Sequence, residues 1–214
     1  MPKKGEASRE AILRTSREII LEEGIEKLAH GAIAARLGLS KSAVLYHYSS
    51  KRALWEALIA QYVGHLAEEE ARHEASYIDS GLSPEEAILP AMRDWFMDFS
   101  RNAEGWVEIG AALIGLHQND KALLEPIRGW YRDLYRRIAQ SGLPREKAFA
   151  AMMTFDGLFN SMKLGLFVLD RDAAERISGQ VLEDLFKDQP GKLTKIEAVH
   201  LNLVSGRNSH DIAD

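Results

Sequence analysis

The spacing of apolar residues constrains the fold of this chain more than any other feature of its sequence. Apolar side chains recur at intervals of three and four positions nearly throughout, as in Leu54, Leu58 and Tyr62, which places them on one face of a helix. β-branched residues are sparse, and no segment shows the period-two alternation of a half-buried strand. The sequence therefore predicts an all-α protein, long enough at 214 residues for one medium domain or two small ones.

Capping residues and helix breakers divide this pattern into segments. Ser8, Ser50 and Ser83 precede apolar runs as N-caps, and Gly24 and Gly38 follow such runs as stop signals. After Gln189-Pro190-Gly191 the periodicity fades, so we expect the last residues to form a tail. The predicted helices span residues 8–23, 31–37, 40–47, 51–77, 84–102, 104–117, 120–141, 145–169 and 171–187.

Charge is distributed unevenly along the chain, whose formal net charge is −5. Residues 1–64 carry ten Lys and Arg against seven Asp and Glu, and no carboxylate lies between Glu26 and Glu56. A surface segment with one sign of charge favours a polyanionic partner such as nucleic acid. The basic residues of this acid-free segment are Lys27, Arg36, Lys41, Lys51 and Arg52.

The centre of the acid-free segment has the pattern of a helix-turn-helix. Two short helices that cross steeply need a small residue at their contact and a glycine in the turn. Ala34 and Gly38 meet these needs, and Val44 is one of the apolar residues that would lock the helices together. If Val44 faces inward, helical spacing turns the other side of the second helix toward a DNA major groove. The outward residues would then be Lys41, Ser42, Leu45 and Tyr46.

The residue types at the start of this second helix suit contact with DNA. Ser40 would cap the helix, whose N-terminus favours phosphate. Lys41 can reach a phosphate or the O6 and N7 atoms of guanine, and Ser42 can bond to a base edge or to the backbone. Ala43 or Leu45 can pack on a thymine methyl group. These residues would therefore supply most of the base contacts.

Tyr46 and Lys51 are expected to anchor phosphates on either side of the base contacts. Ordinary packing is the alternative role for the aromatic residues here, and we favour it for His47 and Tyr48 more than for Tyr46. The predicted DNA-binding residues are Lys27, Arg36, Ser40, Lys41, Ser42, Ala43, Leu45, Tyr46 and Lys51.

Residues 8 to about 64 resemble the DNA-binding domain of the TetR family of bacterial transcriptional regulators. The resemblance rests on a first helix that ends at EEGI and on the following segment IAARLGLSKSAVLYHYSSKRAL. In this segment the family's glycine, serine, lysine, aromatic pair, second lysine and leucine match Gly38, Ser40, Lys41, His47, Tyr48, Lys51 and Leu54.

Three positions depart from the family pattern. Ala43 stands where the family usually has a threonine, and Leu45 stands where it has a phosphate-binding tyrosine, so we expect Tyr46 to take over that role. His30 replaces the serine or threonine that usually starts the second helix, so the cap of that helix is expected to be weak unless the imidazole or a neighbour serves.

The resemblance also implies a domain organisation for the whole chain. Residues 1–52 would form the helix-turn-helix DNA-binding domain, residues 53–190 a helical effector-binding and dimerisation domain, and residues 191–214 a C-terminal tail. The long helix from Lys51 would connect the two domains.

A small-molecule effector of unknown identity is the second partner that the resemblance implies. Pockets between helices are usually built from apolar and aromatic walls with a few polar groups, although most of these side chains would serve equally well as plain core. For Asp156 we favour a structural role over ligand binding, and His117 could equally cap the end of a helix. The predicted ligand-binding residues are Trp95, Phe99, Trp106, His117, Met152, Phe155, Asp156 and Phe159.

A homodimer is expected because a single helix-turn-helix reads few bases and such proteins usually bind paired half-sites. By analogy with the family, residues 145–169 and 171–187 would form a four-helix interface with a second subunit, with an intramolecular core as the alternative. A ligand that prefers one spacing of the two DNA-reading heads would then change operator affinity. Repression relieved by ligand is the commoner mode in the family.

Two other classes of function compete with a regulator. Two Glu-x-x-His spacings, Glu70 to His73 and Glu197 to His200, raise the possibility of a di-iron carboxylate enzyme in a helical bundle. The first lies in the charged run AEEEARHE, which we expect to be solvated, and the second in the expected tail. The other alternative is a DNA-bound protein-interaction module with no small-molecule effector.

The remaining sequence features point to a cytoplasmic regulator. We predict no catalytic residue, no metal site and no cofactor. The chain has no cysteine, which fits a reducing compartment. Its longest apolar run near the end of the chain, about six residues, is far short of the roughly 20 that span a membrane, so no membrane partner is expected.

Overall fold

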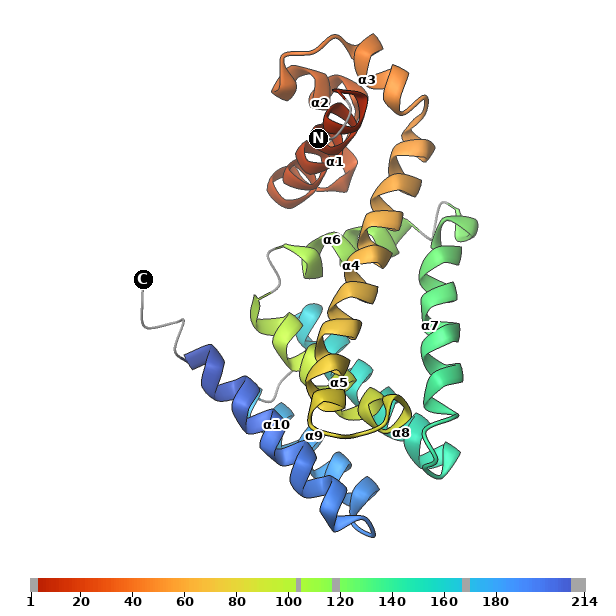
Figure 1. The fold of residues 1–214 in the computed structure, drawn as a ribbon. Helices are drawn as coiled ribbons and strands as arrows, with labels where there is room; N and C mark the ends of the chain where they lie inside the picture. The colour runs from red at the N-terminus through yellow and green to blue at the C-terminus, as the bar shows by residue number, and fades with distance from the viewer. Residues whose placement is uncertain (1–3, 103–104, 117–119, 167–169, 209–214) are drawn as a thin grey trace. The chain divides into compact units, whose positions relative to one another are not determined.

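The computed structural model describes residues 4–102, 105–116, 120–166 and 170–208 (Figure 1). Within these ranges the chain forms ten α-helices, two short 3-10 helices and no strand, which confirms the all-α prediction. None of the helices in this part of the chain is long and apolar enough to cross a membrane. The α-helices are α1 (Lys4–Glu23), α2 (His30–Leu37), α3 (Lys41–His47), α4 (Lys51–Asp79), α5 (Pro84–Asn102), α6 (Trp106–Gly115), α7 (Glu125–Ile138), α8 (Arg145–Lys163), α9 (Arg171–Phe186) and α10 (Pro190–Asn208).

Two predicted helices are shorter in the structure. Residues Lys121–Leu124 form the 3-10 helix η3 instead of the first turn of α7, because Asp120 caps this turn and Pro126 has no N–H to continue a helical ladder. Helix α8 ends at Lys163 and not at 169. Gly165 takes a left-handed conformation there, with φ of 65°, and ends the helix.

The expected tail is wrong for residues 191–208, which belong to α10. Pro190 is the first residue of this helix. Proline is favoured at this position because an N–H group there would have no acceptor within the helix. Ile196 and Val199 are buried, and α10 packs against α9 (Figure 1). The periodicity is weak because only a narrow stripe of α10 is apolar, but that stripe is enough to hold the helix.

Contacts divide the chain into two compact units, which do not coincide with the predicted domain boundaries. The first unit contains Met1–His65 and Glu104–Trp130, and the second contains Leu66–Ala103 and Tyr131–Asp214. Helix α6 therefore belongs with the N-terminal helices and not with the predicted effector domain. The functional meaning of the boundaries stays a prediction.

The core of the first unit joins α1, α2, α3 and the first half of α4, with α6 against α1. Trp106 of α6 stacks on His65 with ring centres 4.7 Å apart, and the guanidinium of Arg17 lies over the Trp106 ring, 5.2 Å from its centre. The buried side chains of this core include Ile12, Ile19, Leu28, Ile33, Val44, Leu54 and Leu58.

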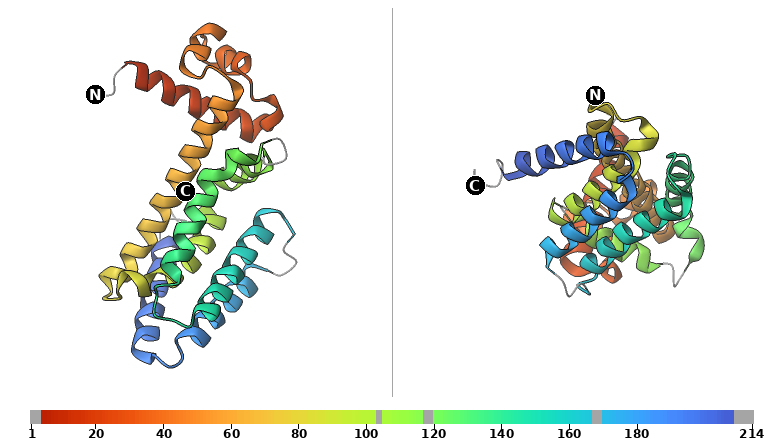
Figure 2. Two further views of the ribbon diagram at one scale, coloured as in Figure 1. Left: turned by 90° about the vertical axis from the view of Figure 1, so that its right-hand side faces the viewer. Right: turned by 90° about the horizontal axis from the view of Figure 1, so that it is seen from below.

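The second unit is a bundle in which α5 packs on α8 and α9, and α8 packs on α9 (Figure 2). Its core is aromatic: Phe96 stacks on Phe159 with ring centres 5.0 Å apart, beside Trp95. The other large buried side chains include Met92, Met152, Phe155, Leu182 and Phe186.

Candidate nucleic-acid interface

The turn between α2 and α3 has the geometry that the sequence predicts. Gly38 is left-handed, with φ of 64° and ψ of 28°, and Leu39 N–H donates to the carbonyl of Ala34 at 2.9 Å. A residue with a Cβ would be strained in this conformation, whereas glycine is not. Ala34 is buried at the contact between the helices, and Val44 from α3 is fully buried. The turn therefore fixes α3 against α2 and α1.

Ser40 caps α3 as predicted. Its Oγ accepts a hydrogen bond from Ala43 N–H at 3.1 Å and lies 2.9 Å from the Oγ of Ser42. This cap satisfies a backbone donor that α3 would otherwise leave without a partner.

One side of α3 faces solvent. Lys41 and Ser42 are exposed, and Tyr46 is 85% exposed, with its ring edge-on to His47 at 5.2 Å. Leu45 and Ala43 are half-buried. The accessible edge of α3 therefore consists of Lys41, Ser42 and Tyr46, while Ala43 and Leu45 flank the buried Val44.

Lys51 lies at the start of α4, where Ser50 Oγ accepts a hydrogen bond from Ala53 N–H at 3.1 Å. The ammonium group of Lys51 is 5.1 Å from the centre of the Trp55 ring. This contact holds the lysine stem along the helix while the charge stays at its first turn.

Arg36 differs from the other predicted DNA-binding residues because it is already paired. Its guanidinium lies 2.7 Å from Glu22 and 2.5 Å from Glu23 at the end of α1. The hydrogen bonds with Glu22 and then Glu23 raise the pKa of Arg36 above its usual value. The sequence missed this pair because both acids precede the acid-free segment. Lys27, in the 3-10 helix η1 (Ile25–Lys27), is exposed.

His30 and Tyr48 have structural roles. No side chain caps α2, whose N-cap residue is Ala29, in line with the weak cap expected here. The ring of His30 is buried, and its Nε2–H donates to the carbonyl of Tyr48 at 2.8 Å. Tyr48 is itself buried. His30 thus ties the start of α2 to the end of α3, a contact that its sequence position did not reveal.

The predicted effector residues are brought together only in part. Trp95, Met152, Phe155 and Phe159 are buried within the second unit. Trp106 lies on α6, which belongs to the first unit. The side chain of Phe99 and the whole of His117 lie outside the described residues.

Asp156 is half-buried on α8 and bonds to neutral donors. Its Oδ1 accepts hydrogen bonds from the hydroxyl of Tyr131 and from Nδ2 of Asn160, both at 3.0 Å. These bonds join α7 to α8 and support the structural role that we favour for Asp156.

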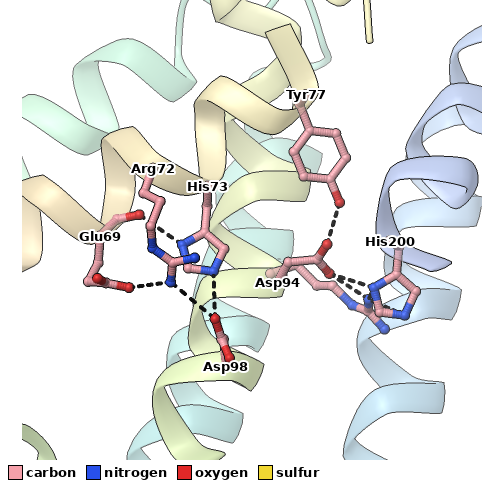
Figure 3. A network of polar contacts seen from close by, with 8 residues as sticks. Glu69, Arg72, His73, Tyr77, Asp94, Asp98 and His200 are labelled. Atoms are coloured by element: carbon pink, nitrogen blue, oxygen red, sulfur yellow. Dashed lines mark hydrogen bonds and ion pairs between the residues drawn. The ribbon is translucent and has the colours of Figure 1, made fainter. Parts of the chain in front are cut away.

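A buried polar network in the second unit is the main feature that the sequence did not predict (Figure 3). Asp94 is 1% exposed and accepts hydrogen bonds from Tyr77 at 2.5 Å, Arg93 at 2.7 Å and His200 of α10 at 2.9 Å. Burial raises the pKa of Asp94, but the hydrogen bond from His200 and the charge of Arg93 outweigh it, so this pKa lies below its usual value. Arg93 also donates to Ser178 at 3.0 Å.

A second cluster of the network centres on α4. His73, 1% exposed, lies 3.2 Å from Asp98, and Arg72 also reaches Asp98. Arg137 forms ion pairs with the buried Glu70 and Glu74. The expectation that the run AEEEARHE is solvated is therefore wrong for three of its residues, namely Glu70, His73 and Glu74.

The predicted location of His200 in a tail is also wrong, because α10 carries it to Asp94. A signal was present in the sequence: Arg93, Asp94 and Asp98 interrupt the apolar segment AILPAMRDWFMDF, and buried charges need partners.

The two Glu-x-x-His spacings do not converge on a metal site. Glu70 is committed to Arg137, while His73 turns to Asp98 and His200 to Asp94. Among the described residues, no three His, Cys, Asp or Glu side chains are grouped as metal ligands. The acids are instead matched with arginines and histidines.

Comparison with known families places both parts of the chain. Residues 12–58 match the family of bacterial regulatory proteins named after tetR, and residues 94–185 match the tetracycline repressor-like C-terminal domain. Both matches describe regulators and not enzymes.

Two curated proteins are similar in sequence. The class C tetracycline repressor of Escherichia coli is 42% identical over 50 residues, which cover 23% of each chain. The transcriptional regulator BetI of Stenotrophomonas maltophilia is 30% identical over 130 residues, which cover 58% of this chain and 64% of BetI. The matched part of this chain thus spans less than two thirds of either relative.

Solved structures show the same fold. A transcriptional regulator from Rhodococcus sp. Rha1 matches with a TM-score of 0.67 at 18% identity, over 85% of this chain and 97% of that one. The multidrug binding protein EbrR, complexed with malachite green, matches with a TM-score of 0.62 at 17% identity, over 84% and 98%.

Proposed function

Because this chain belongs to the TetR family of transcriptional regulators, we propose that it binds a palindromic DNA operator as a homodimer and represses transcription until a small-molecule effector binds. The single observation that carries this proposal is the accessible edge of α3. Tyr46 is 85% exposed and Lys41 is exposed, while Val44 of the same helix is fully buried. Such an edge, held by a rigid turn, suits a DNA major groove.

The proposed contacts divide into two kinds. Lys41 and Ser42 would read base edges, with Ala43 and Leu45 packed against thymine methyl groups. Tyr46, Lys51 and the more distant Lys27 would bind phosphates, which set affinity and orientation more than sequence preference. Arg36 would bind a phosphate in exchange for Glu22 and Glu23, with which it is already paired.

Selection of duplexes from a random pool tests the proposal directly. We expect a palindromic site whose affinity falls steeply with salt. Replacing Lys41 and Tyr46 by alanine should remove specific binding, whereas Lys187→Ala, which removes an exposed charge at the end of α9, should leave it unchanged. Recovery of no preferred sequence, or equal binding by the double variant, would refute the reading edge.

Exposed apolar side chains support the homodimer. Met153 of α8 is 65% exposed and Ile177 of α9 is 36% exposed, while Leu164 and Leu166 beyond the end of α8 are 60% and 69% exposed. A second copy that covered them would remove apolar area from water. We expect sedimentation to show a dimer, and Met153→Asp with Ile177→Asp to give monomers that no longer bind the paired half-sites.

The effector would bind within the second unit, where Trp95, Met152, Phe155 and Phe159 are candidates to line its site. EbrR, whose fold is similar, is known as a complex with imidazole, ethidium and malachite green. Thermal unfolding against a panel of small molecules tests this part, since ligands of the native state raise its stability. A protein-interaction module would respond to none of them. Operator binding also implies the predicted cytoplasmic location.

A further inference from the structure

We propose that Arg52 is a further DNA-phosphate contact and that Asp120 competes with DNA for it. This inference rests on the proposed operator binding. Arg52 lies in the first turn of α4, next to Lys51, and its side chain is 51% exposed. Its guanidinium forms an ion pair with Asp120, a residue 68 positions further along the chain in the same unit.

The charge of Arg52 is held by two carboxylates. Its Nε donates to Glu56, one turn along α4, at 2.8 Å, and its Nη1 donates to Asp120. Both acids lie outside the segment between Glu26 and Glu56 that carries no carboxylate. Asp120 thus brings a negative charge to the end of α4 that begins directly after the reading helix α3.

Asp120 uses its two carboxylate oxygens for different purposes. Oδ1 accepts a hydrogen bond from Ala122 N–H at 2.9 Å and so caps η3, while Oδ2 accepts from Arg52. The conformation of the Asp120 turn and the position of Arg52 are therefore joined through one side chain. By linkage, whatever strengthens this pair weakens DNA binding to the same degree.

A phosphate can replace Asp120 on Arg52 because both offer oxygens in a geometry that a guanidinium accepts. The ion pair is partly exposed, at 51% and 28% of the two side chains, and pairs of this kind are weak. Breaking this ion pair on binding to DNA therefore costs little free energy. The pair lowers operator affinity but does not prevent DNA binding.

Three variants test the proposal on the operator selected for the wild type. Asp120→Asn keeps a good cap for η3 but removes the charge, and we expect about threefold tighter binding for each reading head, or about tenfold for a dimer. Arg52→Gln should weaken binding and reduce the salt slope by about 0.9 for each head. In the double variant, the gain from Asp120→Asn should vanish.

Glu125→Gln is the matched control, since it removes one negative charge close in sequence to Asp120 without touching Arg52. It should change affinity far less than Asp120→Asn does. Thermal unfolding checks that each variant folds, and Asp120→Ser, which also caps without charge, replaces Asp120→Asn if the latter is unstable.

The outcomes separate the inference from the proposed function. If the wild-type chain binds specific DNA but Asp120→Asn and Asp120→Ser bind no tighter, or if the gain persists with Arg52→Gln, Asp120 is not a competitor and the inference is wrong. An unchanged salt slope in Arg52→Gln refutes the phosphate contact. Absence of any specific DNA binding by the wild type refutes the proposed function itself, and the inference with it.

Discussion

Replacing Asp94 by asparagine should destabilise the second unit more than most single substitutions would. Asparagine has the same shape and can still accept the hydrogen bond from Tyr77, but it carries no charge. Arg93, whose side chain is 5% exposed, would then lie buried without its counterion, although Ser178 still bonds to it. Removing one partner of a buried ion pair costs about 3–5 kcal/mol.

A second ion pair provides a control with the same chemistry. Asp133 pairs with Arg136 on α7, but the two side chains are 51% and 67% exposed. Asp133→Asn should cost under about 1 kcal/mol, because water solvates the charge of Arg136 once Asp133 has lost its own. The substitution is identical at both positions, so the difference in cost measures the buried setting of Asp94 together with its three hydrogen-bond partners.

Urea unfolding followed by circular dichroism measures the two free energies, and a thermal scan adds a second readout. At about 2–4 °C for each kcal/mol in a chain of this size, Asp94→Asn should lower the Tm by roughly 6–20 °C. If Asp94→Asn and Asp133→Asn lower stability equally, the buried pair contributes no more than an exposed one and the reasoning fails.

Three further predictions concern charge and backbone. Folding lowers the pKa of Asp94 below its unfolded value of about 3.8, so the ionised carboxylate stabilises the fold above pH 3.8 and this stabilisation is lost as the pH falls further. The difference in unfolding free energy between wild type and Asp94→Asn, measured in urea, should therefore become smaller below pH 3.8. Gly38→Ala should cost about 1–2 kcal/mol through its left-handed backbone alone, since nothing lies within 4 Å of the added Cβ, and a Tm scan should show this. Arg137→Met should cost about 3–5 kcal/mol by removing the guanidinium that pairs with the buried Glu70 and Glu74, while Arg137→Lys, tested by the same urea titration, should recover part of this loss.

Local chemistry explains what the sequence could predict. The turn at Gly38, the cap at Ser40 and the outward position of Tyr46 depend on neighbours within a few residues, and each was found as expected. Helical periodicity predicted nearly all the α-helices, because apolar residues repeat on the side of each helix that is buried.

Long-range pairing explains what the sequence could not predict. The charged run around His73 looks solvated until Asp98 and Arg137 are brought beside it by other helices. The ion pairs of Arg36 were missed because its two acids lie at the end of α1, outside the acid-free segment. No local pattern reveals that α6, which carries Trp106, packs with the first unit.

The bond between His200 and Asp94 also orders events during synthesis of the chain. The two residues are 106 positions apart, so at bacterial elongation rates the ribosome needs roughly 5–20 s to add the histidine after the aspartate. Every residue of the first unit, by contrast, has been added once Trp130 is in place. The nascent chain can therefore finish its reading head while Arg93 and Asp94 still await the last member of their cluster.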